Sequence, residues 1–182
     1  MQNQVNPHFL FNSLNTLGSL IDIDPQKAKE FTRELSMFYR ELLYFKDKEL
    51  VPVSDELNFV RKYIYLQKIR FGSNLEVSVH ISDENGFEII PMSLQMMIEN
   101  AIKHNIISKE KPLTIIIGQT DEASIFVENN LQLRDNVTGS NHIGLKNLTE
   151  RYRFLTGREL IVTSNQHFFR VTLPLIDLKL KP

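Results

Sequence analysis

The sequence predicts an α+β fold, in which an N-terminal antiparallel helical hairpin precedes a two-layer α/β sandwich. Three observations lead to this prediction. Apolar residues recur in steps of three and four through most of the first 71 residues, which is the period of an amphipathic helix. Beyond residue 74 they alternate over short runs, as in half-buried strands, and two helical patterns interrupt these runs. A chain of 182 residues has room for one medium-sized domain or two small ones, and we expect a division into 1–50 and 51–182.

The first two helices are predicted from their apolar spacing. A spacing of four, three and four makes one helix face apolar, with Leu10, Leu14, Leu17 and Ile21. Asp24 is a preferred N-cap residue, and Pro25 suits the first position of a new helix. After it, apolar residues follow steps of three and four over almost three heptads, which is typical of a bundle or coiled-coil seam: Ala28, Phe31, Leu35, Phe38, Leu42 and Phe45.

Two helices joined by so short a loop form an antiparallel hairpin. A hairpin alone buries its apolar stripe poorly, so we expect a homodimer in which two hairpins make a four-helix bundle. The alternative is that both helices pack on their own domain.

A third, connecting helix is expected over 54–71, after a polar connector at 46–53. Ser54 is a candidate N-cap, and the acidic residues 55–56 suit the first helical turn. Gly72 is a plausible stop for this helix, because glycine favours the position just past a helix end. Its buried stripe is predicted to hold Leu57, Val60 and Ile64.

The remaining sequence alternates between strand and helix patterns. Strands are expected at 75–81, 113–117, 125–127, 159–164 and 168–174. One helix is expected to open at Pro91, and another covers 145–155 after a polar loop at 129–142. Helices on one face of a mostly antiparallel sheet make a two-layer domain.

The composition excludes several classes of protein. Hydrophobic residues are 42% and charged residues 24% of the chain, as in a globular protein with a real core. The net charge of −1 gives no basic balance, so we expect no direct contact with nucleic acid. The absence of cysteine excludes disulfides and fits a reducing compartment. No apolar run approaches the roughly 18 residues of a membrane span. We expect a cytoplasmic fragment without membrane contact, cut from a longer parent protein.

The first motif lies at residues 6–15, which read NPHFLFNSLN. On a helix, His8, Asn12, Asn15 and Ser19 share one polar face, which helix formation alone does not require. A histidine near neutral pH can act as a nucleophile or a base. The alternative is a solvated helix face that starts at Pro7.

The string NPHFLFN followed by LN resembles the phosphoacceptor box of the LytS-like sensor histidine kinases. The resemblance implies that His8 is phosphorylated from ATP. It also places Asn12 where many histidine kinases orient a water molecule when they dephosphorylate their partner. The commonest histidine kinases have an acidic residue directly after the histidine to take its proton. Phe9 stands there in this sequence, so that rule assigns no general base.

The second motif reads ENAIKH at residues 99–104, within an amphipathic helix pattern. Asn100, Lys103 and His104 fall on one helix face at i, i+3 and i+4. The motif resembles the N-box of the GHKL (Bergerat) ATPase superfamily. The resemblance implies Asn100 as a ligand of Mg²⁺, with Lys103 and His104 near the phosphates of ATP. Glu99 is either a base or, in our preferred interpretation, a support of the site. An exposed helix face is the alternative.

The third motif reads IGLKNL at residues 143–148. A glycine at a helix start lets backbone amides approach a phosphate, and the helix N-terminus favours the anion. The motif resembles the glycine box of the same kinases and follows the N-box in the expected order. The resemblance implies ATP-binding roles for Gly144, Leu145, Lys146 and Asn147.

Two departures from the family pattern affect the nucleotide site. The box that reads adenine usually runs Asp-x-Gly-x-Gly after a strand. Here Asn129 takes the place of the aspartate, and Leu131 takes the place of a glycine. A neutral amide still accepts a hydrogen bond from the adenine amine, but more weakly than a carboxylate. The glycine expected before Ile143 is replaced by His142.

The function predicted from these motifs is that of an ATP:protein-histidine phosphotransferase, the core of a two-component sensor. Its partners would be a second copy of the chain and a response regulator, often of LytTR type in this family. The resemblance implies a parent protein in the cytoplasmic membrane. One alternative is a catalytically degenerate dimeric scaffold, which the changes at Asn129 and Leu131 favour. A chaperone-like or topoisomerase-like ATPase is another, but it would lack the hairpin that carries His8.

Overall fold

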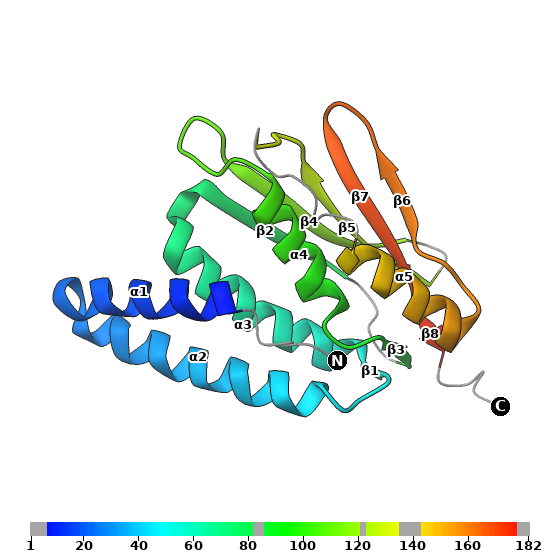
Figure 1. Ribbon diagram of the computed structural model, residues 1–182, viewed down its shortest axis with the longest axis horizontal. Coiled ribbons are helices and arrows are strands. Elements are labelled where there is room, and N and C mark those ends of the chain that lie inside the picture. The colour runs from blue at the N-terminus through cyan, green and yellow to red at the C-terminus, as the bar shows by residue number, and fades with distance from the viewer. Residues whose placement is uncertain (1–6, 82–85, 121–122, 135–142, 178–182) are drawn as a thin grey trace.

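The computed structural model describes residues 7–81, 86–120, 123–134 and 143–177. A five-stranded sheet forms one layer, and helices form the other (Figure 1). The connecting helix α3 (Val53–Phe71) lies between the N-terminal hairpin and the sheet, and it contacts both. The predicted α+β arrangement is therefore confirmed.

The hairpin consists of α1 (Pro7–Ile23) and α2 (Pro25–Phe45), which run antiparallel (Figure 1). The predicted cap between them is confirmed, because Asp24 Oδ1 accepts a hydrogen bond from the backbone N–H of Lys27 at 3.0 Å. Pro25 then occupies the first turn of α2, where its missing N–H leaves no hydrogen bond unmade.

All six apolar residues of the predicted α2 seam are buried inside this one chain. Aromatic rings from three helices cover the seam. Phe38 stacks on Phe59 of α3 with ring centroids 4.9 Å apart, and Phe9 of α1 meets Phe38 edge-on at 5.2 Å. For α2, the structure therefore agrees with the alternative to the dimeric bundle, in which the helix packs on its own domain. No second copy of the chain is needed to bury its apolar stripe.

The apolar face expected on α1 packs only in part on the rest of the chain, because Leu17 contacts the core and the two residues on either side of it along this face do not share its burial. Phe9 and Ser13 are the buried residues of this helix, whereas Leu14 and Ile21 keep 49% and 56% of their surface exposed. The large ring of Phe9 fills the gap between α2 and α3. Leu14 and Ile21 of the predicted face then lie outward, whereas Leu17 still packs against the core.

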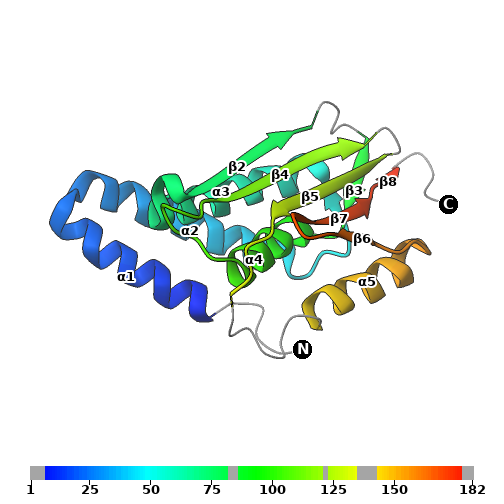
Figure 2. The same cartoon turned by 90° about the horizontal axis from the view of Figure 1, so that it is seen from above.

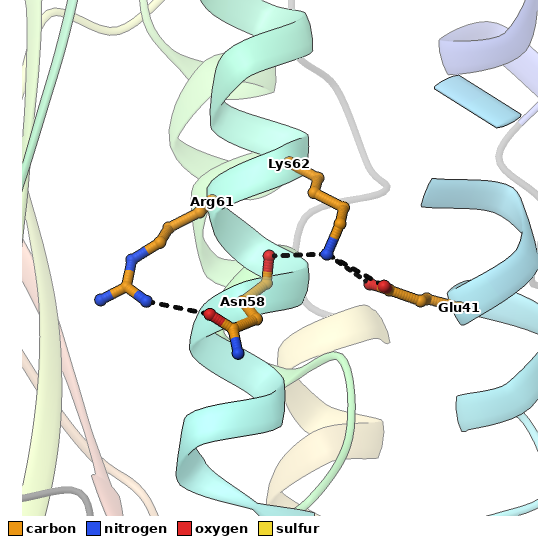
Figure 3. A network of polar contacts seen from close by, with 4 residues as sticks. All are labelled: Glu41, Asn58, Arg61 and Lys62. Atoms are coloured by element: carbon orange, nitrogen blue, oxygen red, sulfur yellow. Dashed lines mark hydrogen bonds and ion pairs between the residues drawn. The ribbon is translucent and has the colours of Figure 1, made fainter. Parts of the chain in front are cut away.

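Polar contacts also hold α2 on α3 (Figure 3). Lys62 of α3 reaches Glu41 of α2, with Nζ 2.9 Å from Oε1. The backbone oxygen of Asn58 also accepts from Lys62 Nζ at 3.5 Å, while the Asn58 side chain accepts from Arg61 at 3.1 Å. The lysine side chain is mostly buried, so this ion pair is screened less than an ordinary surface pair.

Helix α3 starts slightly earlier than predicted, at Val53. Pro52 is its N-cap and makes no side-chain capping bond, so the capping role predicted for Ser54 is wrong. The stop at Gly72 is confirmed, with φ of 59°. The connector before α3 contains β1 (Val51–Pro52), which the sequence did not predict. It pairs antiparallel with β3 (Phe87–Ile89), which pairs with β8 (Ile176–Asp177).

The main sheet has the order β2-β4-β5-β7-β6 (Figure 2). Its strands are β2 (Leu75–His80), β4 (Leu113–Thr120), β5 (Ser124–Asn130), β7 (Phe168–Pro174) and β6 (Ile161–Ser164). Only the β2–β4 pair in this sheet is parallel; the other three neighbouring pairs are antiparallel. The expectation of a mostly antiparallel sheet is confirmed.

Helices α4 (Ser93–His104) and α5 (Ile143–Thr156) pack on the same face of this sheet as α3. Alternate residues of β4 and β5 are buried beneath them, and Tyr152 of α5 is completely buried. Of the loop expected at 129–142, the first two residues extend β5, and residues 135–142 lie outside the described part. Within the described residues, no helix is long and apolar enough to cross a membrane.

Candidate functional site

A cavity of about 270 Å³ opens between the helical layer and the sheet. Its walls come from α4, the start of α5, the segment after β5, and strands β5, β6 and β7. Most of its lining is apolar, with a few polar groups, which is the usual chemistry of a small-molecule site. The polar side chains are Asn100, His104, Asn105 and Asn129, and the apolar ones include Leu131, Leu133, Leu145, Val162 and Phe169.

Helix α4 contributes two of the predicted site residues to this cavity. Asn100 and His104 lie one turn apart and both line it. Lys103 is exposed on the same helix and does not line the cavity. Glu99 is half-buried, and its carboxylate accepts a hydrogen bond from Gln95 at 3.2 Å, which suits a supporting role.

Asn129 is 5% exposed and lines the cavity from β5. Its Nδ2 donates to the backbone oxygen of Asn130 at 2.7 Å. The amide therefore presents its carbonyl oxygen as the group that can accept a hydrogen bond from a ligand. Leu131 also lines the cavity, and its backbone N–H donates to the His167 oxygen at 2.8 Å. The two departures from the family pattern thus lie together at this wall.

The third motif divides between the cavity and the surface. Leu145 lines the cavity, whereas Lys146 and Asn147 are exposed on the first turns of α5. A Cβ atom on Gly144 would meet only the sulfur of Met96, at 3.8 Å, so the backbone here is open to close approach. His142 lies outside the described residues.

Asn105 is a cavity residue that sequence reasoning did not select. Its side chain is fully used inside the chain, because Nδ2 donates to the Ala101 oxygen at 2.9 Å and Oδ1 accepts from the Gln132 N–H at 2.8 Å. It therefore fixes the segment after β5 against the end of α4. The local sequence offers no signal for such a long-range bond.

Glu56 is the second residue that was missed, and it positions α4. Its carboxylate is completely buried and accepts hydrogen bonds from the backbone N–H groups of Met92 and Leu94 at 2.8 and 2.9 Å. Burial raises the pKa of Glu56 to about 7, although these backbone bonds oppose the rise. The helix begins at Ser93 rather than Pro91, with Met92 in the left-handed region at φ 64°. A carboxylate from α3 thus caps the helix that carries Asn100.

The first motif, which resembles a phosphoacceptor box, lies on α1 and is separate from the cavity lining. His8 is exposed in the first turn, and Asn12 Nδ2 lies 3.0 Å from His8 Nδ1. Asn15 and Ser19 continue the same exposed face, and the Ser19 hydroxyl donates to the Asn15 backbone oxygen at 3.2 Å. A metal ion would depend on few protein ligands, since no three acidic or histidine side chains gather in the described part of the chain.

Comparison with known proteins assigns these features to a family. A family model described as histidine kinase matches residues 1–75. The sensor protein LytS of Oceanobacillus iheyensis is 34% identical over 177 residues, which are 87% of this chain and 30% of that protein. The chain is thus similar to sensor histidine kinases over most of its own length. The sensor histidine kinase BtsS of Escherichia coli strain K12 is 32% identical over 179 residues.

The chain spans 30% and 32% of the length of those two relatives. A structural likeness accompanies the sequence match. The catalytic domain of histidine kinase ThkA superposes with a TM-score of 0.49 at 14% identity, over 69% of this chain and 94% of that domain.

Proposed function

We propose that this chain is the catalytic core of a LytS-like sensor kinase that transfers the γ-phosphoryl group of ATP to His8. The observation that carries the proposal is the cavity in which Asn100, His104 and Asn129 meet, on the same chain as the phosphoacceptor motif. In this proposal residues 1–50 form the phosphotransfer hairpin and residues 51–182 the ATP-binding domain.

The apolar walls of the cavity suit the flat faces of a purine. Leu131, Leu145 and Phe169 supply such walls. The Asn129 oxygen would accept a hydrogen bond from the exocyclic amine of adenine, because its Nδ2 is already engaged with Asn130. An amide accepts this bond less strongly than the aspartate of related kinases.

The phosphates would extend from the cavity toward Lys103 and the start of α5. Lys103 would neutralise phosphate charge, and the backbone amides at Gly144 would donate to phosphate oxygens at the positive end of the helix. Lys146 and Asn147 lie exposed on the same helix turn. Mg²⁺ would supply charge neutralisation at the phosphates, and Asn100 is the side chain that would hold it.

In the transfer step, a ring nitrogen of His8 attacks the γ-phosphorus of ATP. A phosphorus–nitrogen bond forms, the bond to the β–γ bridging oxygen breaks, and its electron pair leaves on ADP. The imidazole N–H proton passes to water. The side-chain amide of Asn12 orients the His8 ring through His8 Nδ1. When this amide is rotated by 180°, Asn12 Oδ1 accepts a hydrogen bond from the N–H at His8 Nδ1, and His8 Nε2 becomes the nucleophile.

The phosphoryl group would then pass to an aspartate of a response regulator, of LytTR type by family resemblance. A second copy of the chain would cover the exposed apolar face of α1. The parent protein would be a sensor of the cytoplasmic membrane, with this chain on the cytoplasmic side. These partners follow from the relatives LytS and BtsS, which are named as sensor proteins.

Calorimetric titration with ATP and Mg²⁺ tests the proposal, beside an Asn100→Ala variant. Saturable binding that is lost in this variant and kept in the control Asn58→Ala would support the kinase function. Labelled phosphate from ATP should then appear on the wild type and on His80→Ala, but not on His8→Ala. An absence of binding at millimolar ATP would favour the degenerate scaffold instead.

A further inference from the structure

A small cavity of about 10 Å³ separates α1 from α3, next to the phosphoacceptor motif. This volume is about what one water molecule needs. One side of the cavity is polar, although it lies between two packed helices. The polar residues around it are Asn12, Ser13 and Thr16 of α1 and Gln67 and Arg70 of α3.

Arg70 lies in the last turn of α3, with its guanidinium 4.7 Å from the centroid of the Phe71 ring. Partial burial lowers the pKa of Arg70, and the nearby charge of Arg134 adds to this effect. Among the described residues, neither arginine forms an ion pair with a carboxylate. Two arginines within electrostatic reach of each other favour an anion between them.

Arg134 is fixed on the side of the nucleotide cavity. Its backbone N–H donates to the His104 oxygen at 3.1 Å, and its Nε donates to the Asn105 oxygen at 2.7 Å. It therefore lies at the end of α4, one residue after the cavity-lining Leu133. Arg70 thus lines the cavity beside Asn12, and Arg134 lies within its electrostatic reach at the end of the helix that carries Asn100.

We propose that Arg70 is a catalytic residue that binds the phosphoryl group on His8, with Arg134 adding positive potential from the nucleotide side. The inference rests on the proposed role of His8 as phosphoacceptor. Asn12 shares the small cavity with Arg70 and lies 3.0 Å from His8 Nδ1. Asn12 lies four positions after His8 on the helix, about 6 Å along the axis, a distance that an arginine side chain covers.

The guanidinium suits this task better than an ammonium group. Its planar N–H donors bind two phosphoryl oxygens in parallel, and it stays charged when partly buried. A purely structural role would be simpler: a cation in the last turn complements the helix dipole of α3. That role would not depend on whether His8 carries a phosphoryl group, and the two roles are separable by experiment.

Phosphoramidate, a small phosphoryl donor that needs no nucleotide site, provides the test. We would measure the initial rate of phosphohistidine formation on the full chain by intact mass, with His8→Ala as the blank. Arg70→Ala should slow the rate about tenfold or more, as expected for loss of a charge-assisted hydrogen bond. The rate for Arg70→Lys should lie between those of Arg70→Ala and the wild type, and the rate for the control Arg61→Ala should match the wild type.

Two further measurements keep the result unambiguous. The Nε–H resonance of Arg70 should shift when His8 is phosphorylated, and the ATP affinity of Arg70→Met, which keeps the apolar stem, should equal that of the wild type. Equal phosphoramidate rates in Arg70→Met and Arg61→Ala, or a wild type that phosphoramidate does not label on His8, would overturn the inference. Labelling by phosphoramidate but not by ATP would refute the proposed kinase function while leaving the role of Arg70 intact.

Discussion

At the scale of single residues, buried polar groups decide how the site is held. Glu56 accepts two backbone hydrogen bonds from the start of α4, and Asn105 ties the end of the same helix to Gln132. Both ends of the helix that presents Asn100 are thus fixed by side-chain bonds from or to other segments. An unmade bond at such a buried group costs about 1–3 kcal/mol, so these positions should tolerate little change.

The carboxyl of Glu56 predicts how stability depends on pH. Its folded pKa of about 7 lies above the ordinary 4.5, so the folded chain binds the extra proton more tightly than the unfolded chain. This difference in pKa contributes up to about 3 kcal/mol to the free energy of unfolding. The contribution is fully present below the unfolded pKa of 4.5 and is lost as the pH rises to about 7. Denaturant unfolding at pH 5 and pH 8 should show this loss in the wild type and not in Glu56→Gln. Parallel curves for the two proteins would contradict it.

Asn129 predicts an unexpected result for the substitution that restores the family's aspartate. The amide donates to the Asn130 oxygen at 2.7 Å, and a carboxylate there would place two oxygens together. Asn129→Asp should therefore lower the free energy of unfolding by about 1–3 kcal/mol, more at pH 8 than at pH 5, because only a protonated carboxyl can donate. The matched control is Asn165→Asp, since Asn165 Oδ1 only accepts, from the N–H groups of His167 and Phe168. Equal losses in both variants would refute the explanation.

At the scale of the elements, α1 and α2 use their apolar residues differently. The apolar seam of α2 is buried by contacts within the chain, whereas α1 buries Phe9 and leaves Phe11, Leu14 and Ile21 exposed. These three residues are spaced by three and seven, so they share one helix face. This outward face of α1 is the natural contact for a second hairpin.

The exposed face of α1 predicts a dimer that one charge can disrupt. Leu14→Glu places a carboxylate in the centre of that face, so the dissociation constant should rise at least about tenfold, which corresponds to about 1.4 kcal/mol. Ile161→Glu changes another exposed apolar residue, on β6, and should leave association unchanged. Sedimentation equilibrium measures both. A wild type that stays monomeric at high concentration would exclude this contact.

At the scale of the whole molecule, one continuous core runs from the hairpin through α3 and α4 to the sheet. Long periodic elements, such as α2 and β7, were predictable because their patterns repeat often enough to be recognised. The small sheet was not, since strands of two or three residues such as Val51–Pro52 carry no period. The cavity residues Asn100, His104 and Asn129 came from motif resemblance. Glu56 could have been suspected, because it shares the buried stripe of α3 with Val60 and Tyr63.

One long-range contact ties α5 to the connector that follows the hairpin. Arg151 of α5 donates to the backbone oxygens of Lys48 and Glu49, at 2.9 and 3.4 Å, in the connector between α2 and β1. Arg151→Ala should speed amide hydrogen exchange several-fold in both α5 and the connector, because each segment loses a hydrogen-bond partner in the other. Arg153→Ala removes only an exposed pairing with Glu159 and should change neither segment. Equal exchange rates in the connector of the Arg151→Ala and Arg153→Ala variants would contradict this prediction. In that case α5 and the hairpin would be coupled only through the hydrophobic core, and the Arg151 contact could not carry a signal between them.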